Sequence, residues 1–476
     1  MSSFGLYPIS ELENTNVFKV YILKSVEDIV GPLSEKKYLD LLTRKVDLGK
    51  SVVFIDEIGS AFVLPEKKAL SYYKAREYFR NKGYEVATLI KGEKVAEVAV
   101  YAVDEEAVYD FTEGLILSTY KFDKYKTGPK DSPKYQLYLD QLSKAKVTAL
   151  QHILEAVFLC RDWVNEPVIH LTAEQFAEEI FDVCSELPYT KVEVMNKQKI
   201  EALKMGGLLA INKGAPNPPT FTIVEYRHPE ATNVKPIALV GKGVVYDTEG
   251  LSLKETAGSM DIMKCDMAGA AAVVSTIVAL AKNEVPLHVM VFVPATENRP
   301  DGNAIVPSDI ITMYNGKTVE ILNTDAEGRI ILGDALAYCE KFDPELIIDL
   351  ATLTGAAIAA IGKEASVFIG TADDELKTRF VSSSFDTHER VVEFPLWEEY
   401  EKEIESDVAD IKNIGSGTGA GSITAAAFLK HFVTKPWMHL DIAGPAFIKP
   451  EASYRGKHAS GYGVRLLYDF LSRYQS

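Results

Sequence analysis

The chain has 476 residues, of which 47% are hydrophobic and 25% are charged, as is ordinary for a globular protein. Its formal net charge of −17 argues against nucleic acid as a main partner, because phosphate binding requires a basic surface. The length is enough for about two to four domains, each with a core of its own.

The four cysteines are widely spaced and form no C-x-x-C pair, so neither a zinc knuckle nor a thioredoxin-type motif is visible. Such a low number is typical of a reducing compartment. The N-terminus lacks a basic segment followed by an apolar core, and no apolar run reaches the roughly 20 residues that span a bilayer. The sequence therefore predicts a cytoplasmic protein without a membrane partner.

Residues 1–145 alternate short apolar stretches with charged segments that have helical spacing, such as Glu66–Lys82. The apolar stretches are Val17–Leu23, Ser51–Ile55 and Val95–Val103. This alternation predicts a small N-terminal α/β domain. Thr119–Pro133 is rich in Lys, Asp, Gly and Pro, which predicts a loop or linker.

A longer helical pattern follows over Tyr135–Phe158, and we expect a connecting helix at residues 146–165. Beyond it, strand-like runs alternate with helical stretches such as Ile262–Ala281 and Ile330–Phe342. The strand-like runs are Ile237–Val240, Leu287–Val293, Leu346–Leu350 and Met438–Ile442. This order predicts an α/β domain over residues 166–476, with a mostly parallel, doubly wound sheet flanked by helices.

Asn323–Arg329 (NTDAEGR) carries two carboxylates and a guanidinium at alternate positions, just before an apolar run. On an extended backbone, Asp325, Glu327 and Arg329 would share one face. Two adjacent acids repel each other unless cations lie between them, which favours half of a metal site. The alternative is a capped helix start, with Asp325 near the N-terminus of the helix predicted at Ile330–Phe342.

Two more segments place lysines and acids next to glycines. A strand-like run ends in Gly241-Lys242-Gly243, with Asp247 and Lys254 behind it, and Asp266 lies on a predicted helix. Taken singly, the lysines would be solvated and Asp266 would lie on a helix surface. Ligands of open α/β sheets, however, bind beyond the carboxyl ends of the strands. Together the segments supply hard oxygen ligands for two divalent cations, namely Asp247, Asp266, Asp325 and Glu327.

These segments resemble the leucyl aminopeptidase family of two-metal exopeptidases. The matching blocks are Gly241-Lys-Gly with Asp247, Met263-Lys-Cys-Asp-Met-Ala-Gly269 and Asn323–Arg329, followed by Asp349–Gly355, Asp410-Ile-Lys-Asn and Ser422–Leu429. The resemblance covers about residues 160–476, and NTDAEGR is its most specific part. The region before it resembles the family only in size and position.

The resemblance implies a role for each matched residue. The metal ligands would be Lys242, Asp247, Asp266, Asp325 and Glu327, with Asp247 and Glu327 bridging. Lys254 would polarise the scissile carbonyl, and Arg329 would hold a bicarbonate ion that acts as general base. The side-chain pocket would include Met263, Thr352, Gly355 and Ala446. Asp266 would also accept a hydrogen bond from the substrate amine.

The function implied by the resemblance is a metal-dependent aminopeptidase that releases leucine-like, apolar residues from peptides with a free N-terminus. Two divalent cations about 3.5–4 Å apart would activate a water molecule. They would be zinc or manganese, with magnesium or cobalt possible, since the ligand types do not decide the metal. The resemblance also implies a homohexamer, in which the N-terminal domain would serve assembly or access control.

Glu249 departs from the family pattern, which has glycine at this position. If φ is positive there, the conformation costs a non-glycine residue about 1 kcal/mol. The added carboxylate would become an extra ligand, change the metal preference, block substrate or point to the surface. The alternative function is therefore a catalytically impaired metal-binding or scaffolding oligomer of the same fold.

Two other enzyme classes are disfavoured. A Ser/His hydrolase would need a G-x-S-x-G elbow, which is absent, and none of the eight histidines lies in the first three matching blocks, Gly241–Asp247, Met263–Gly269 and Asn323–Arg329. Gly415, Gly417 and Ala420 fit the nucleotide pattern G-x-G-x-x-A, but no clear apolar strand precedes them. A flexible rim loop of the active site is the favoured interpretation.

Overall fold

The computed structural model describes residues 3–14, 16–28, 35–66, 68–128, 133–417, 419–451 and 453–474. The chain divides into two compact units, of which the first comprises Met1–Phe158 and Pro450–Lys457. The second unit comprises Leu159–Lys449 and His458–Ser476, and the division falls within helix α4 (Lys144–Asn165). Part of the predicted linker, residues 129–132, lies outside the described residues, as does Thr418 of the predicted rim loop.

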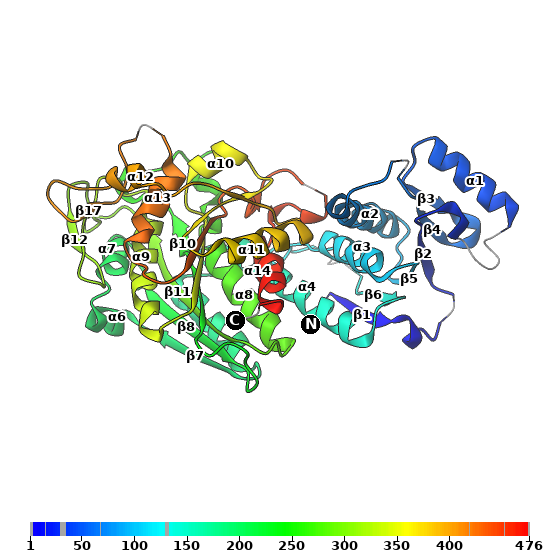
Figure 1. The fold of residues 1–476 in the computed structure, drawn as a ribbon, viewed down its shortest axis with the longest axis horizontal. Coiled ribbons are helices and arrows are strands. Elements are labelled where there is room, and N and C mark those ends of the chain that lie inside the picture. Colours follow the sequence, from blue (N-terminus) through cyan, green and yellow to red (C-terminus); the bar gives the residue numbers. More distant parts are fainter. Residues whose placement is uncertain are drawn as a thin grey trace. The chain divides into compact units, whose positions relative to one another are not determined.

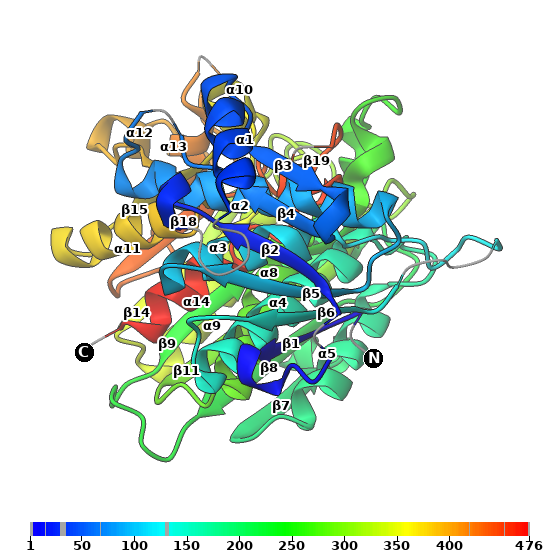
Figure 2. The same cartoon turned by 90° about the vertical axis from the view of Figure 1, so that its right-hand side faces the viewer.

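The described part of the first unit has a six-stranded sheet in the order β1-β6-β5-β2-β4-β3 (Figure 2). Its strands are β1 (Phe4–Pro8), β2 (Phe18–Ile22), β3 (Val52–Ile55), β4 (Ser60–Val63), β5 (Glu97–Ala102) and β6 (Tyr135–Leu139). All neighbours are parallel except β3 and β4. The helices are α1 (Lys36–Asp47), α2 (Tyr72–Gly92) and α3 (Glu105–Ser118). The predicted α/β character of this region is confirmed.

The helix predicted to start at Tyr135 is wrong in its first residues. Strand β6 occupies Tyr135–Leu139, where buried and half-buried positions alternate, and α4 begins only at Lys144. Tyr135, Leu137 and Leu139 have a period of two, whereas Tyr135, Tyr138 and Leu139 have a helical spacing. Pairing with β1 and β5 makes the segment a strand.

Buried charges hold α2 and α3 together. Arg80, which is 1% exposed, lies 2.7 Å from Asp110 and 2.5 Å from Glu113 on α3. The Tyr454 hydroxyl donates to Glu77 of α2 over 2.8 Å. This network fastens the late segment Pro450–Lys457 to the helices of the first unit.

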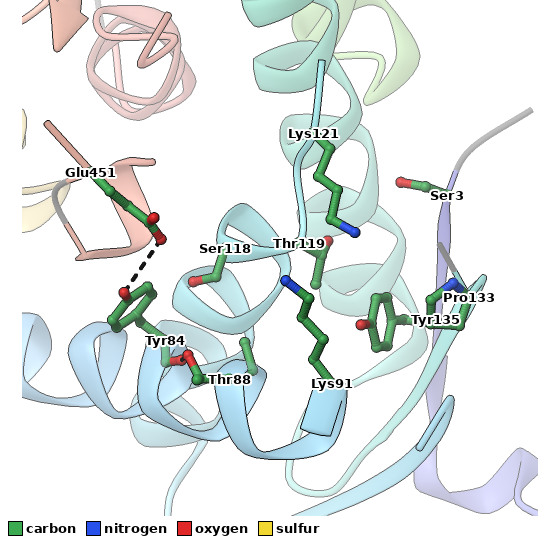
Figure 3. A pocket seen from close by; sticks show the side chains of 11 residues that line it. Ser3, Tyr84, Thr88, Lys91, Ser118, Thr119, Lys121, Pro133, Tyr135 and Glu451 are labelled. Atoms are coloured by element: carbon green, nitrogen blue, oxygen red, sulfur yellow. Dashed lines mark hydrogen bonds between the residues drawn. The ribbon is translucent and has the colours of Figure 1, made fainter. Parts of the chain in front are cut away.

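A pocket of about 320 Å³ lies in the first unit, between α2, the segment after α3, and β6. Figure 3 shows Lys91 and Lys121 extending into this pocket, with a hydrogen bond of 3.3 Å between Tyr84 and Glu451. Its lining, as far as the structure describes it, contains none of the predicted metal ligands. The pocket is thus separate from the predicted metal centre.

The described part of the second unit has a nine-stranded sheet, ordered β16-β15-β18-β14-β9-β11-β8-β7, with β10 paired to β11. The strands are β7 (Thr190–Met195), β8 (Thr220–Arg227), β9 (Ile237–Gly241), β10 (Gly243–Asp247), β11 (His288–Asn298), β14 (Leu346–Ala351), β15 (Ser366–Gly370), β16 (Val391–Glu393) and β18 (Trp437–Asp441). The central strands β18, β14, β9 and β11 are parallel, which confirms the predicted fold class. A small sheet joins β12 (Ile310–Thr312), β13 (Thr318–Glu320) and β17 (Ile411–Lys412), and β19 (Phe447–Ile448) pairs with β20 (His458–Ala459).

Helices cover both faces of this sheet (Figure 1). Helices α7 (Gly206–Asn212), α9 (Glu327–Cys339) and α13 (Gly421–Lys430) pack on one side, and α8 (Ala268–Lys282) and α14 (Val464–Ser472) pack on the other. The remaining helices are α5 (Ala173–Ser185), α6 (Lys197–Leu203), α10 (Gly355–Ile361), α11 (Asp374–Asp386) and α12 (Glu398–Lys402).

Helix α8 is buried along nearly its whole length and approaches the sheet closely. A side-chain carbon built on Gly269 would lie 2.0 Å from the carbonyl oxygen of Leu350 in β14. Among the described residues, Met260–Lys282 is the stretch long and apolar enough to cross a membrane, yet 83% of its apolar window is buried inside the protein. This stretch therefore belongs to the protein core.

The predicted helix Ile262–Ala281 is interrupted. A 3-10 turn covers Met260–Cys265, and α8 starts at Ala268. Asp266 lies at the break, where its carboxylate is hydrogen-bonded to Lys242 and Thr352. The predicted helix Ile330–Phe342 is confirmed, although α9 begins three residues earlier at Glu327 and ends in a 3-10 turn, Glu340–Phe342.

Candidate metal centre

The structure brings the predicted ligands together at one edge of the second sheet. Lys242 follows β9, Asp247 ends β10, and Asp266 precedes α8. Asp325 lies in the turn before α9, and Glu327 is the first residue of that helix. The carboxyl ends of parallel strands meet at this edge, so segments far apart in sequence become neighbours.

The local geometry of Asn323–Arg329 differs from the predicted extended segment and agrees with the alternative only in placing Asp325 just before a helix. Asp325 lies in a turn, and Glu327 and Arg329 lie in the first turn of α9, so no extended strand aligns the three side chains. Asp325 does not cap the helix either, because the N-cap residue is Ala326 and makes no side-chain bond. The Asn323 side chain accepts the Asp325 N–H over 2.9 Å, which shapes the turn.

Three carboxylates form a compact cluster that suits a cation. Oxygen atoms of Asp247, Asp325 and Glu327 all lie within 4.8 Å of one another. Burial and the nearby Glu327 charge raise the pKa of Asp247 to about 6 and that of Asp325 to about 7. Burial also opposes ionisation of Glu327, but its ion pair with Lys242 outweighs this effect and lowers its pKa.

Lys242 joins the cluster to Asp266. Its ammonium nitrogen is 2.7 Å from Asp266, 2.8 Å from Glu327 and 2.9 Å from the carbonyl oxygen of Thr352. Burial lowers the pKa of Lys242, but the two carboxylates outweigh it and raise the pKa above its ordinary value. Burial raises the pKa of Asp266 well above its usual range, against the Lys242 charge.

The Lys254 ammonium group contacts three carboxylates. Its nitrogen is 2.9 Å from Asp247 and 2.8 Å from Glu249, and it is also hydrogen-bonded to Asp325. Burial lowers its pKa, but the pairs with Asp247 and Asp325 raise it overall. The two lysine ammonium groups thus neutralise part of the acidic charge, as bound cations would.

The residues present fit divalent cations. Five carboxylates contact the two lysines, so the group has a formal excess of negative charge, and three of the acids, Asp247, Asp266 and Glu327, are buried. Buried charges of one sign require compensation, and hard carboxylate oxygens are ligands for divalent metals. A cation bound among them would also lower the pKa of the neighbouring amine, as Lys242 needs in order to ligate a metal.

Arg329 lies in a different environment from the lysines. It is 7% exposed and donates from Nη1 to the carbonyl oxygen of Asn413 over 2.9 Å, while its buried Nε has no hydrogen-bond partner within the described part of the chain. Burial lowers its pKa to about 10. A buried guanidinium with an unused N–H is suited to bind a small anion.

The predicted pocket residues are spread over neighbouring segments. Thr352, just after β14, donates to Asp266 over 2.8 Å, and the Met263 carbonyl accepts the Asp266 N–H over 3.3 Å. Gly355 begins α10 with open space where a side chain would be. Ala446 is buried just before β19. Of the four, the structure links Met263 and Thr352 to the acidic group through Asp266.

Two supporting residues, Asn298 and Asn413, received no role from the sequence. Asn298, at the end of β11, donates to Asp247 over 2.9 Å and to the Thr324 carbonyl over 3.0 Å. The Asn413 side chain accepts the Leu322 N–H and donates to the Asn323 carbonyl, and so fixes the turn that carries Asp325. A signal for Asn298 existed, since it stands at the carboxyl end of a central strand.

The family is decided by the match of residues 158–468 to the catalytic domain of the cytosol aminopeptidase family. The chain belongs to this family. It is accordingly a hydrolase of a metal-dependent aminopeptidase family, and the matched range contains every residue of the acidic cluster. The resemblance seen in the sequence is confirmed.

Relatives match this chain in sequence over nearly its whole length. The chain is 41% identical to a probable cytosol aminopeptidase of Chloroherpeton thalassium, covering 98% of this chain and 96% of that protein. It is 37% identical to a probable cytosol aminopeptidase of Clostridium perfringens, covering 98% and 94%. The solved structure of the bottromycin maturation enzyme BotP in complex with Mn superposes with a TM-score of 0.83 at 28% identity, covering 96% and 99%.

Proposed function

We propose that this protein removes apolar, leucine-like residues from the free N-terminus of peptides, with two divalent cations per subunit. The observation that carries the proposal is the cluster of buried Asp247 and Glu327 with half-buried Asp325, and Lys242 and Asp266 beside it. The three acids of the cluster would bind one cation. Lys242 and Asp266 would supply ligand atoms for a second.

The proposed ligands are Lys242, Asp247, Asp266, Asp325 and Glu327. Asp247 and Glu327 would bridge the two cations, which agrees with their near-complete burial and their place within the shared cluster. When bound, the cations supply a water of lowered pKa and an electrophilic centre. The remaining steps are the work of the side chains around them.

Lys254 would polarise the scissile carbonyl, since its ammonium group borders the cluster and its pKa is raised. An oxyanion donor of this kind is typically worth about 3–4 kcal/mol of transition-state stabilisation. Arg329 would hold a bicarbonate ion as general base, which its unused buried Nε supports. Asp266 would accept a hydrogen bond from the substrate amine and so restrict cleavage to the N-terminus.

The substrate side chain would lie against Met263, Thr352, Gly355 and Ala446. The open space beside Gly355 supports this assignment. The cations would be zinc or manganese, with magnesium or cobalt as further candidates, because carboxylates and an amine do not select among them. Manganese in the solved relative favours it as the first metal to test.

We further propose that residues 166–476 form the catalytic domain, residues 146–165 a connecting helix, and residues 1–145 an assembly or access-control domain of a homohexamer. The family match over residues 158–468 supports the catalytic assignment. The proposed compartment is the cytoplasm, as the names of the relatives suggest, with neither membrane nor nucleic acid as partner.

Glu249 supports a second candidate, a catalytically impaired scaffold, because its carboxylate contacts the proposed electrophile Lys254. Hydrolysis of leucine p-nitroanilide by the full chain, with added Mn²⁺ or Zn²⁺, separates the two. The proposal expects turnover that Asp325→Ala abolishes and that Asp407→Ala, an exposed acid outside the cluster, leaves unchanged. A correctly folded protein without turnover under either metal would favour the scaffold.

A further inference from the structure

Glu249 occupies a backbone conformation that favours glycine. Its φ is +69°, and the next residue, Gly250, also has a positive φ of +59°. A left-handed conformation costs a residue with a side chain about 1 kcal/mol. A strained residue at this place requires a compensating interaction.

The main chain of Glu249 does not provide that explanation. Its N–H donates to Asp247 Oδ1 over 2.8 Å, and its carbonyl oxygen accepts from the Thr324 hydroxyl. Both bonds hold the turn beside the cluster, but glycine would make them equally well and without strain. The side chain must therefore account for glutamate at this position.

The side chain of Glu249 pairs with Lys254, at 2.8 Å between Oε1 and Nζ. Two other carboxylates contact the same ammonium group, those of Asp247 and Asp325. Both of these belong to the cation cluster, whereas Glu249 does not. Among the described residues, Glu249 is thus the carboxylate partner of Lys254 that lies outside the three-acid cluster.

We propose that Glu249 is a positioning residue, which holds the Lys254 ammonium away from the cluster when Asp247 and Asp325 ligate metal. This inference rests on the proposed function. Without Glu249, Lys254 would have only the two metal-binding aspartates as anionic partners and would compete with the cations for them. With it, Lys254 keeps a charge-assisted hydrogen bond and stays charged beside the position of the substrate carbonyl.

The decisive experiment measures Mn²⁺ affinity, by calorimetric titration of the metal-free full-length protein. Glu249→Gln keeps the side-chain size and the left-handed residue but removes the charge, and it should weaken Mn²⁺ binding about tenfold. Glu249→Gly removes both the charge and the strain, and it should weaken binding to the same extent. An affinity loss with Gln that Gly does not reproduce would attribute the effect to the backbone and overturn the proposal.

A double-mutant cycle separates an action through Lys254 from a direct action on the metal. In a Lys254→Met background there is no ammonium group to hold away, so Glu249→Gln should change Mn²⁺ affinity by less than about twofold. A full tenfold loss in this background would make Glu249 a direct ligand and contradict the proposal.

The failure of this inference is distinguishable from failure of the proposed function. A wild-type protein that binds no Mn²⁺ overturns both the role of Glu249 and the proposed function. A wild-type protein that binds Mn²⁺ with an affinity unchanged by Glu249→Gln overturns the role of Glu249 alone and leaves the proposed metal centre in place.

Discussion

Asn298 donates one hydrogen bond to Asp247 Oδ1 over 2.9 Å and another to the carbonyl oxygen of Thr324 over 3.0 Å. It thereby connects the end of β11 both to a cluster acid and to the turn that carries Asp325. An amide in this place orients Asp247 without adding charge to a group already rich in acids.

Asn298→Asp should therefore damage the centre more than Asn298→Ala does. The aspartate turns a donor into an acceptor facing the Asp247 carboxylate, and like charges at this distance repel. Loss of a residue that orients a metal ligand typically lowers activity or metal affinity by about 10–100-fold, and we expect Ala near the lower and Asp near the upper end. Measured kcat/KM and Mn²⁺ affinity that are equal in both variants and the wild type would contradict this role.

Arg329→Ala should lower kcat by about 100-fold and leave KM nearly unchanged, because a general base held there acts in the chemical step. In buffer depleted of carbon dioxide, the wild-type rate should rise when bicarbonate is added, and the variant rate should not. Arg329→Lys keeps the charge but lacks the planar donor fork, and its kcat should lie between those of the wild type and Arg329→Ala. The same bicarbonate response in wild type and Arg329→Ala would show that the anion acts elsewhere.

Asp334 of α9 makes stability depend on pH. Its carboxylate accepts the Leu208 and Tyr314 N–H groups over 2.9 and 2.7 Å, but burial raises its pKa to about 7. Between about pH 4 and 7 the folded state keeps a proton that the unfolded state has lost. As the pH rises through this window, the contribution of Asp334 to the free energy of unfolding therefore falls by about 1.4 kcal/mol for each pH unit.

Asp334→Asn removes this titration. Urea denaturation of the metal-free proteins at pH 5, 6 and 7 should show that the variant gains stability relative to wild type at each step. A constant difference between the two proteins across this range would refute a raised pKa for Asp334.

Close packing between α8 and the sheet predicts a further effect. A methyl group on Gly269 would meet the Leu350 carbonyl oxygen, and overpacking of a core costs typically about 1–3 kcal/mol. Gly269→Ala should lower the melting temperature, whereas Gly302→Ala, with open space at its side-chain position, serves as the matched control. Equal melting temperatures for Gly269→Ala and wild type would mean that α8 shifts without cost.

The sequence predicts which segments approach one another around the acidic cluster, but not their local geometry. Asp247, Asp266 and Asp325 were selected because acids next to glycines stand out beside apolar runs, and parallel strand ends bring such segments together. The alternation in Asn323–Arg329 predicts an extended segment, but the chain turns here and enters α9, and Asn298 and Asn413 are hydrogen-bonded to that turn. Neutral amides give no charge pattern, so their roles emerge only from the folded chain.

The structure differs from the predicted secondary structure at β6 and before α8, and both differences depend on residues distant in sequence. The spacing over Tyr135–Leu139 fits a strand and a helix alike, and only its neighbours β1 and β5 decide between them. The break before α8 arises where Lys242 and Thr352 hold the Asp266 side chain. Such partners lie far apart in sequence and leave no local signal.

The most direct test of the metal centre is a stepwise titration of the metal-free full-length protein with Mn²⁺, followed by leucine p-nitroanilide hydrolysis. We predict that activity rises up to two equivalents of Mn²⁺ per chain and then levels off. A plateau at one equivalent would contradict the two-cation centre, and no turnover at any ratio in a folded protein would contradict the aminopeptidase function itself.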